Sequence, residues 1–160
     1  MRGGGGGTYG VVISATYQTW PSTPVIVANL QANFTDSDVA KEVLIEFVNT
    51  TASLADAGWG GYAFLSATSL QIEYVATNVS NEDATAAVSP FFYFVGNKTS
   101  DVLASTIPYD SNYAWYRSAE GTAVGVNTEM SSRLLPRTVA LQNPEGVIAS
   151  LLSVNDTVSW

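Results

Sequence analysis

The 160-residue chain contains neither cysteine nor histidine. Thiolate nucleophiles, disulfides, ordinary zinc sites and Ser-His or Cys-His catalytic pairs are therefore excluded within these residues, and we expect no metal site. Basic residues are also scarce, with 6 Lys and Arg against 14 Asp and Glu and a formal net charge of -8. Because such a surface would repel a phosphate backbone, nucleic acid is not expected as a partner.

Long hydrophobic runs are absent as well, so we expect no membrane partner. Met1-Arg2 leads into glycine instead of an apolar segment, so no signal peptide is expected in these residues. N-x-[ST] sequons nevertheless exceed the roughly two that the composition would give by chance. They lie at Asn33, Asn49, Asn78, Asn97 and Asn155. The excess favours a secreted parent protein, and the alternative is accidental sequons in a Ser- and Thr-rich chain.

With 46% hydrophobic residues, the chain has the composition of one folded domain. Alternating apolar residues predict strands, and apolar spacings of three and four predict helices. The strands expected are one over 11–20, one over 25–34 and two within 62–79. The helices expected are one after residues 35–38 that ends before Gly58, one from Asn81 that restarts at Pro90, a short amphipathic piece over 111–119 and one from Pro144. Residues 121–133 remain ambiguous. This order predicts an α+β fold, in which helices cover one face of an antiparallel sheet.

The main low-complexity feature is a run of five glycines at residues 3–7, followed by Gly10. The spacing Gly5-x-Gly7-x-x-Gly10 fits the dinucleotide-binding fingerprint, but that motif needs a helix after the loop, and here a strand is expected. A nucleotide-phosphate loop is excluded too, because no Gly-Lys-Ser or Gly-Lys-Thr closes the run. Bare glycine backbone can contact a ligand closely. A flexible linker remains the alternative.

Two blocks of sequence resemble a known family, the berberine bridge enzyme-like FAD-linked oxidases, particularly the secreted fungal members. The first block is Arg2-Gly3-Gly4-Gly5-Gly6-Gly7-Thr8-Tyr9-Gly10-Val11-Val12, with a strand behind it that ends in Thr19-Trp20-Pro21. The second runs from Gly125-Val126-Asn127 to Ser132-Arg133-Leu134-Leu135-Pro136-Arg137. The resemblance spans essentially the whole chain but only a middle section of a family member.

The resemblance implies an FAD cofactor. It implies that residues 1–21 are the last loop and strand of an FAD-binding domain, and that residues 22–160 are part of a substrate-binding domain. The residues expected to contact FAD are Gly5, Gly6, Gly7, Thr8, Tyr9, Gly10, Val11 and Val12; plain strand packing is the alternative for Tyr9, Val11 and Val12. Family members hold most of the FAD in an upstream domain, in many cases through a histidine. The isolated chain is therefore expected to be a fragment without activity of its own.

In such oxidases the flavin accepts a hydride and the protein supplies a base. Tyr62, Glu73, Tyr74 and Glu129 could supply one, although none matches a family catalytic position, so the catalytic residues stay unknown. Arg133 and Arg137 could steady an anionic group or form ordinary ion pairs. Several aromatic residues could line a substrate pocket or belong to the core and its rim. These are Trp59, Tyr62, Tyr109, Tyr113, Trp115 and Tyr116.

The leading interpretation is a fragment of a secreted FAD-dependent oxidoreductase that acts on a small organic or sugar-like substrate, with oxygen as the acceptor. Its expected partners are FAD and that substrate, and the sequence does not define an oligomeric state. The alternative is a non-catalytic, secreted glycan-binding module in which aromatic residues contact sugars and the glycines form a linker.

Overall fold

A computed structural model describes residues 10–118, 134–153 and 158–159. The predictions for residues 1–9 and for Glu129, Arg133 and Asn155 lie outside the described residues. Asn127 and most of the second family block lie outside them too.

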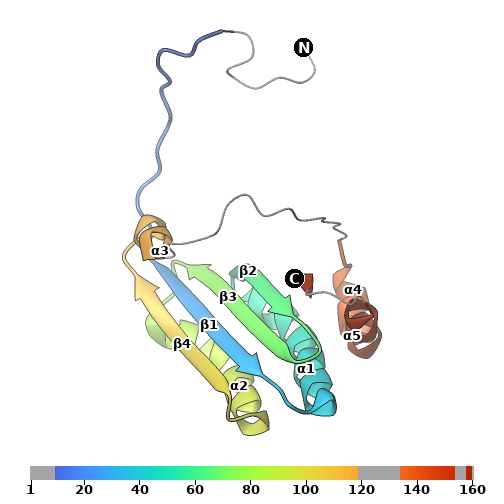
Figure 1. Ribbon diagram of the computed structural model, residues 1–160. Coiled ribbons are helices and arrows are strands. Elements are labelled where there is room, and N and C mark those ends of the chain that lie inside the picture. Colours follow the sequence, from blue (N-terminus) through green and yellow to red (C-terminus); the bar gives the residue numbers. More distant parts are fainter. Residues whose placement is uncertain (1–9, 119–133, 154–157, 160) are drawn as a thin grey trace.

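The described residues form one antiparallel sheet with the strand order β4-β1-β3-β2-β5 (Figure 1). Strands β1 and β3 pair along their full length, from Val25 opposite Thr77 to Asn33 opposite Ser69. The strands are β1 (Val25–Asn33), β2 (Trp59–Leu65), β3 (Ser69–Thr77), β4 (Val102–Tyr109) and the two-residue β5 (Val158–Ser159). The strands predicted within 25–34 and 62–79 are confirmed.

Two long helices, α1 (Ser37–Asp56) and α2 (Asn81–Lys98), cover one face of the sheet (Figure 1). Three shorter helices follow: α3 (Asn112–Ser118), α4 (Arg137–Gln142) and α5 (Pro144–Leu152). Helices α4 and α5 pack against α1. The α+β prediction, with helices on one sheet face, is thus confirmed. No helix within the described ranges is both long enough and apolar enough to cross a bilayer.

Helix α1 is capped by Asp36, within residues 35–38, after which the sequence predicts a helix. The carboxylate of Asp36 accepts hydrogen bonds from the backbone N–H groups of Asp38 at 2.8 Å and Val39 at 3.4 Å. These bonds satisfy two of the amides that the first helical turn leaves without intrahelical partners. The apolar stripe that follows is buried against the sheet at Val43, Leu44 and Phe47.

The core lies between the two helices and the sheet face that they cover. Every second residue of β1 and β3 points into it, in accordance with the two-residue period of a strand. These residues are Ile26, Ala28, Leu30 and Ala32 in β1, and Leu70, Ile72, Tyr74 and Ala76 in β3. The Phe47 ring packs between the rings of Tyr74 and Phe91, with centroid distances of 6.3 and 6.0 Å.

The strand predicted over residues 11–20 is wrong. Residues 11–24 form no regular element, all of them are exposed, and they extend away from the body of the protein (Figure 1). A strand needs a neighbour to accept and donate its ladder hydrogen bonds. No strand within the described ranges pairs with this segment, so its alternating sequence alone does not produce a strand.

The predicted restart of the second helix at Pro90 is also wrong, because α2 runs unbroken from Asn81 to Lys98. Proline removes one helical hydrogen bond, in this case to the carbonyl of Ala86. Both Ala86 and Pro90 are exposed, so water can hydrogen-bond to that carbonyl. Val88 and Phe91 on the opposite side of the helix are buried and hold it on the sheet.

Three elements of the structure were not predicted: β4, α4 and the two-residue β5. Strand β4 is an edge strand that contains Pro108, and most of its residues are exposed, so its sequence lacks a continuous apolar pattern. Helix α4 has six residues and buries only Ala140. The helices predicted from Asn81 and Pro144, and the short one near residues 111–119, are confirmed.

Candidate functional site

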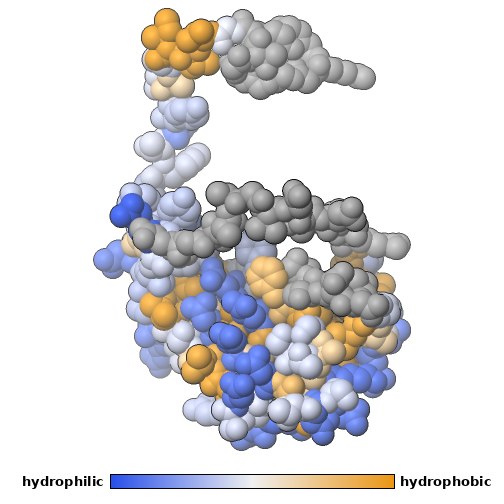
Figure 2. All heavy atoms as spheres, in the orientation of Figure 1, coloured by the Kyte–Doolittle hydropathy of each residue, from blue (hydrophilic) through white to orange (hydrophobic). Residues whose placement is uncertain are grey.

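The sheet face that α1 and α2 leave uncovered, hereafter the open face, is polar over the middle of its two central strands. Asn29 and Gln31 of β1 lie beside Glu73 and Gln71 of β3, respectively, as paired residues of the ladder. Figure 2 shows hydrophilic residues gathered over the middle of this face, with hydrophobic ones at its sides. The same two strands therefore present apolar side chains to the helices, whereas on the other side amides and a carboxylate at Asn29, Gln31, Gln71 and Glu73 give way to Val25, Val27 and Val75 towards one end.

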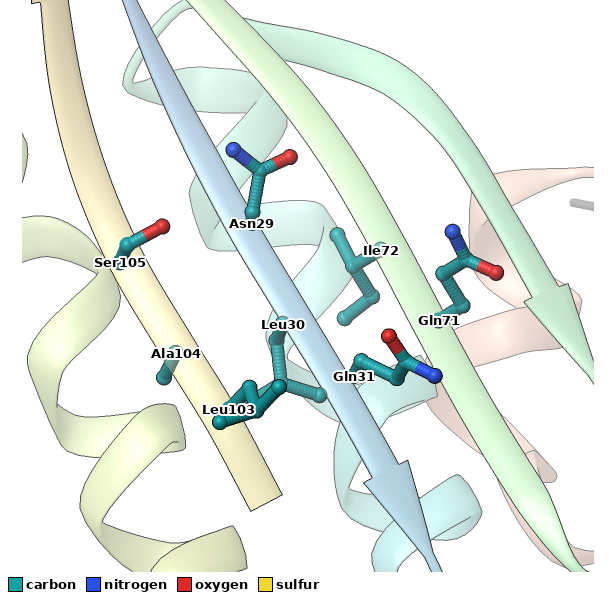
Figure 3. Close-up of a pocket in the computed structure, with 8 residues that line it drawn as sticks. All are labelled: Asn29, Leu30, Gln31, Gln71, Ile72, Leu103, Ala104 and Ser105. Carbon is teal, nitrogen blue, oxygen red and sulfur yellow. The ribbon is translucent and has the colours of Figure 1, made fainter.

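A shallow depression of about 390 Å³ lies on the open face. Figure 3 shows the side chains of Asn29 and Gln31, of Gln71 from β3 and of Ser105 from β4 around it. Leu103 borders the depression and is 73% exposed. The depression thus combines three neutral amides and a hydroxyl with an apolar edge.

The polar groups of the depression have unused hydrogen-bonding capacity. Among the described residues, no side-chain hydrogen bond joins Asn29, Gln31, Gln71 or Ser105 to another protein group. Each carboxamide offers two N–H donors and an acceptor oxygen. The arrangement can therefore bind a ligand that carries hydroxyl or carbonyl groups, without requiring charge on the ligand.

Two of the predicted catalytic candidates come together on the open face. Tyr62 of β2 and Glu73 of β3 are directly opposed in the antiparallel ladder, and Tyr62 is 67% exposed. Directly paired residues on one sheet face have Cβ atoms about 5 Å apart. The phenol of Tyr62 and the carboxylate of Glu73 therefore lie next to each other beside the depression.

Tyr74, the next residue after Glu73, was another candidate base, and the structure turns it away from the open face. Its side chain lies in the core on the helix-covered face and is 8% exposed. Burial raises the pKa of Tyr74 to about 12, since the phenolate would lose its hydration. A phenol in this setting keeps its proton and contributes packing.

The predicted aromatic pocket does not form as one group. Trp59 is buried on the helix-covered face, so it is unavailable to a ligand on the open face. Tyr113 and Tyr116 of α3 are exposed, and the hydroxyl of Ser118 donates a hydrogen bond to the Tyr109 hydroxyl at 3.2 Å. Figure 1 shows α3 at one end of the sheet, away from the centre of the open face.

Arg137 forms the ordinary ion pair that was one of its two predicted roles. Its guanidinium donates two hydrogen bonds of 2.6 Å to the two carboxylate oxygens of Asp56, and this pair links α4 to the end of α1. The hydrogen bonds lower the pKa of Asp56, with a smaller contribution from the charge of Arg137. Both side chains are more than half exposed, so the pair joins surface elements.

Of the predicted FAD contacts, the structure describes Gly10, Val11 and Val12; Gly5, Gly6, Gly7, Thr8 and Tyr9 lie outside the described residues. Gly10 has open space on its side-chain position, while Val11 and Val12 are 92% and 63% exposed. Backbone and side chains here are accessible to a ligand or to another part of a protein. The assignment of FAD contacts to these residues stays a prediction.

The amides of the depression were not identified from the sequence. The sequence does contain an alternating pattern that points to them. Polar residues at Asn29, Gln31 and Asn33 alternate with apolar Ala28, Leu30 and Ala32. Such a pattern predicts a strand with one polar face, but it does not tell which other strands bring their polar residues to the same place. The pairing of β1 with both β3 and β4 supplies that information.

The fold has a counterpart among solved structures. A VAO-type flavoprotein from Myceliophthora thermophila C1 superposes with a TM-score of 0.66 over 84% of this chain and 26% of its own, at 17% identity. This likeness defines the class of fold: the antiparallel sheet and its helices match a portion of a VAO-type flavoprotein.

Sequence comparison narrows the class. FAD-linked oxidoreductase cheF of Chaetomium globosum is 31% identical over 147 residues, which cover 91% of this chain and 23% of the relative. FAD-linked oxidoreductase OXR2 of Pyricularia oryzae is 28% identical over 98% of this chain and 26% of its own length. No protein-family model matches. The predicted resemblance is confirmed: the chain is related over most of its length to fungal FAD-linked oxidoreductases, and it spans about a quarter of their length.

Proposed function

We propose that this chain supplies part of the substrate-binding domain of an FAD-linked oxidase of the berberine bridge enzyme-like type. The observation that carries the proposal is the difference between the two sheet faces. Helices bury one face, while the other presents Asn29, Gln31, Gln71 and Glu73, whose side chains make no hydrogen bond to other described residues and are open to a ligand. In the whole enzyme the open face would form a wall of the cavity in which substrate meets flavin.

The lining of the depression supports a small organic or sugar-like substrate. Neutral amides and a hydroxyl recognise substrate hydroxyl or carbonyl groups, and the exposed edge at Leu103 can contact apolar carbon. Glu73 and Tyr62, opposed beside this site, are the candidates for taking a proton from the substrate. When bound, the FAD would accept the hydride and pass the electrons to oxygen.

The segment before β1 supports the proposed domain division at residue 21. Val11, Ile13, Tyr17 and Trp20 are 81% to 95% exposed, and they lie in a segment of which every described residue is exposed. Large apolar side chains in such a run are typical of a surface that another part of the protein covers. We propose that residues 1–21 pack into the FAD-binding domain, where residues 5–12 contact the cofactor.

The proposal places the whole protein outside the cell and predicts no turnover by the 160 residues alone. Five sequons support secretion. The described residues provide one side of a cavity and no enclosure around a flavin, which supports dependence on the remainder of the enzyme.

A chimeric enzyme tests the proposal. The chain would replace its matching 147-residue segment in the Chaetomium globosum relative, and the product would be made in bacteria and purified. We expect visible flavin absorbance that stays with the protein through gel filtration, and oxygen uptake with one or more of a panel of small alcohols and sugars. The isolated chain should show neither. A correctly folded chimera without flavin would contradict the proposal.

The glycan-binding alternative loses one of its anchors, because Trp59 is buried. The exposed rings at Tyr113 and Tyr116 remain, and retention of the isolated chain on immobilised glycans measures this alternative directly.

A further inference from the structure

Half of the asparagines of this chain lie in sequons for N-glycosylation. The sequence has ten asparagines, and five are followed at the second position by serine or threonine. Four of the five, Asn33, Asn49, Asn78 and Asn97, lie in described residues, and all four are exposed. The structure therefore allows each sequon to be judged by what surrounds its amide.

Three of these amides make no hydrogen bond to the described residues. Among the described residues, no hydrogen bond involves the side chain of Asn49, Asn78 or Asn97. Asn33 differs, because its amide donates a hydrogen bond of 3.1 Å to the carboxylate of Asp101, 68 residues away. A sugar on Asn33 would disturb a link between β1 and the segment before β4, whereas a sugar on any of the other three would meet solvent.

The three free sequons share one region of the fold. Asn49 lies on the exposed side of α1, and Asn97 lies in the last turn of α2. Asn78 lies in the connection from β3 to α2, with φ of 58°, a left-handed conformation that asparagine tolerates better than most residues. All three thus belong to the helix layer or its connection, and none projects from the centre of the open face.

We propose that Asn49, Asn78 and Asn97 carry N-linked glycans in the secreted protein, and that these glycans leave the open face free. The bond forms between each amide nitrogen and the anomeric carbon of a lipid-pyrophosphate-linked oligosaccharide. The lipid pyrophosphate leaves, and the amide loses one proton, with no change of oxidation state. The proposal depends on the secretory location proposed above and is independent of flavin binding.

The structure shows which substitutions remove a glycosylation site without disturbing the fold. The sequon hydroxyls have structural roles: Thr51 donates to the Val48 carbonyl, Ser80 caps α2 by accepting from the Asp83 N–H, and Thr99 donates to the Asn33 carbonyl. Replacing a hydroxyl would therefore change the fold together with the sequon. Substitution of the asparagines avoids this, with aspartate at position 78 because Asp also tolerates positive φ.

The experiment uses the full chain, secreted from yeast behind an added leader peptide. Peptide N-glycosidase converts each glycosylated asparagine into aspartate, and peptide mass spectrometry locates the conversions. We expect conversion at positions 49, 78 and 97, and the loss of one glycan in each of N49Q, N78D and N97Q. N112Q is the matched control, since Asn112 is exposed but not in a sequon, and it should lose none.

An unmodified amide at any of the three positions would overturn the assignment of that site, and unmodified amides at all three would overturn the proposal. Far-ultraviolet circular dichroism of each variant shows that the loss of a glycan does not reflect failed folding. Because the chimera of the previous section is made in bacteria, without N-glycans, absence of flavin there and absence of glycans here are separate results.

Discussion

Around the middle of β1 and β3, the two faces of the sheet carry opposite chemistry although the same strands form both. Neighbouring residues show the contrast most directly: Tyr74 is buried among apolar side chains, while Glu73 lies on the open face between Asn29 and Tyr62. Burial of apolar groups stabilises the fold, and unpartnered polar groups are available for binding. The covered face should thus control stability, and the open face should control ligand recognition.

The largest expected difference lies between two adjacent residues of β1. Leu30 is 1% exposed in the core, whereas Gln31 lies on the open face. Leu30→Ala should lower the free energy of unfolding by about 2–5 kcal/mol, through lost burial and the cavity left behind. Gln31→Ala should change it by no more than about 0.5 kcal/mol. Chemical denaturation measures both, and equal losses would contradict the division between the faces.

A second difference concerns the paired glycines of β2. A Cβ on Gly61 would collide with the carbonyl oxygen of Glu73 and the Cα of Tyr74, while one on Gly60 would meet nothing within 4 Å. Gly61→Ala should therefore lower the free energy of unfolding by about 1–3 kcal/mol, because the β2 and β3 backbones must separate.

Gly60→Ala is the matched control and should be neutral or slightly stabilising, because it reduces the freedom of the unfolded chain. Thermal unfolding of the two variants checks the pair. Equal stability would mean that β2 and β3 do not approach as closely as described.

A third difference appears at high pH. The folded protein holds the pKa of Tyr74 at about 12, above the ordinary value of 10.0. Folding therefore favours the neutral phenol. The resulting stabilisation of the folded state is complete below pH 10 and is lost as the pH rises towards 12, because the phenol ionises first in the unfolded chain. At pH 11 the loss amounts to about 1.4 kcal/mol.

Tyr74→Phe should remove this part of the pH dependence, and Tyr62→Phe should keep it, because the ring of Tyr62 is already in water. Denaturation curves at pH 8 to 11 check the pair. If Tyr62→Phe flattened the profile and Tyr74→Phe did not, the assignment of the two tyrosines to their faces would be wrong.

The smallest effect belongs to the surface contact outside both faces. Arg137 holds the pKa of Asp56 below its usual value. The ion pair therefore stabilises the folded protein at pH values above the usual pKa of an aspartate, and this stabilisation is lost as the pH falls through the lowered pKa of the folded protein. Arg137→Gln should reduce stability only slightly at neutral pH, because both partners are exposed. Lys41→Gln, on the exposed side of α1, is the control. A large loss with Arg137→Gln alone would show that α4 contributes more to the fold than its surface position indicates.

The sequence predicted the parts of the fold that depend on local pattern. Residues 35–38 and the apolar spacing that includes Val43 and Phe47 predicted α1, and the β-type sequence of residues 62–79 predicted β2 and β3. It did not predict β4, whose edge position leaves most residues exposed. It also placed a strand at 11–20, where apolar alternation exists without a pairing partner.

The site was predictable only in part, for a related reason. Tyr62 and Glu73 could be proposed from residue type, but Tyr74 could be rejected only when the register showed which face it occupies. The amides at Asn29 and Gln71 became a site because β1 and β3 pair in one particular register. Pairing of distant strands is not encoded in any local pattern.

The proposed function requires that the open face lies inside the complete enzyme. Because the chain has no cysteine, Gln31→Cys introduces a single thiol on that face and Lys41→Cys a single thiol on the exposed side of α1. Labelling with a thiol reagent, located by peptide mass spectrometry, compares the isolated chain with the flavin-containing chimera. The account predicts that position 31 reacts readily in the isolated chain and is strongly protected in the chimera, while position 41 reacts equally in both. Equal labelling of position 31 in the two proteins would contradict it.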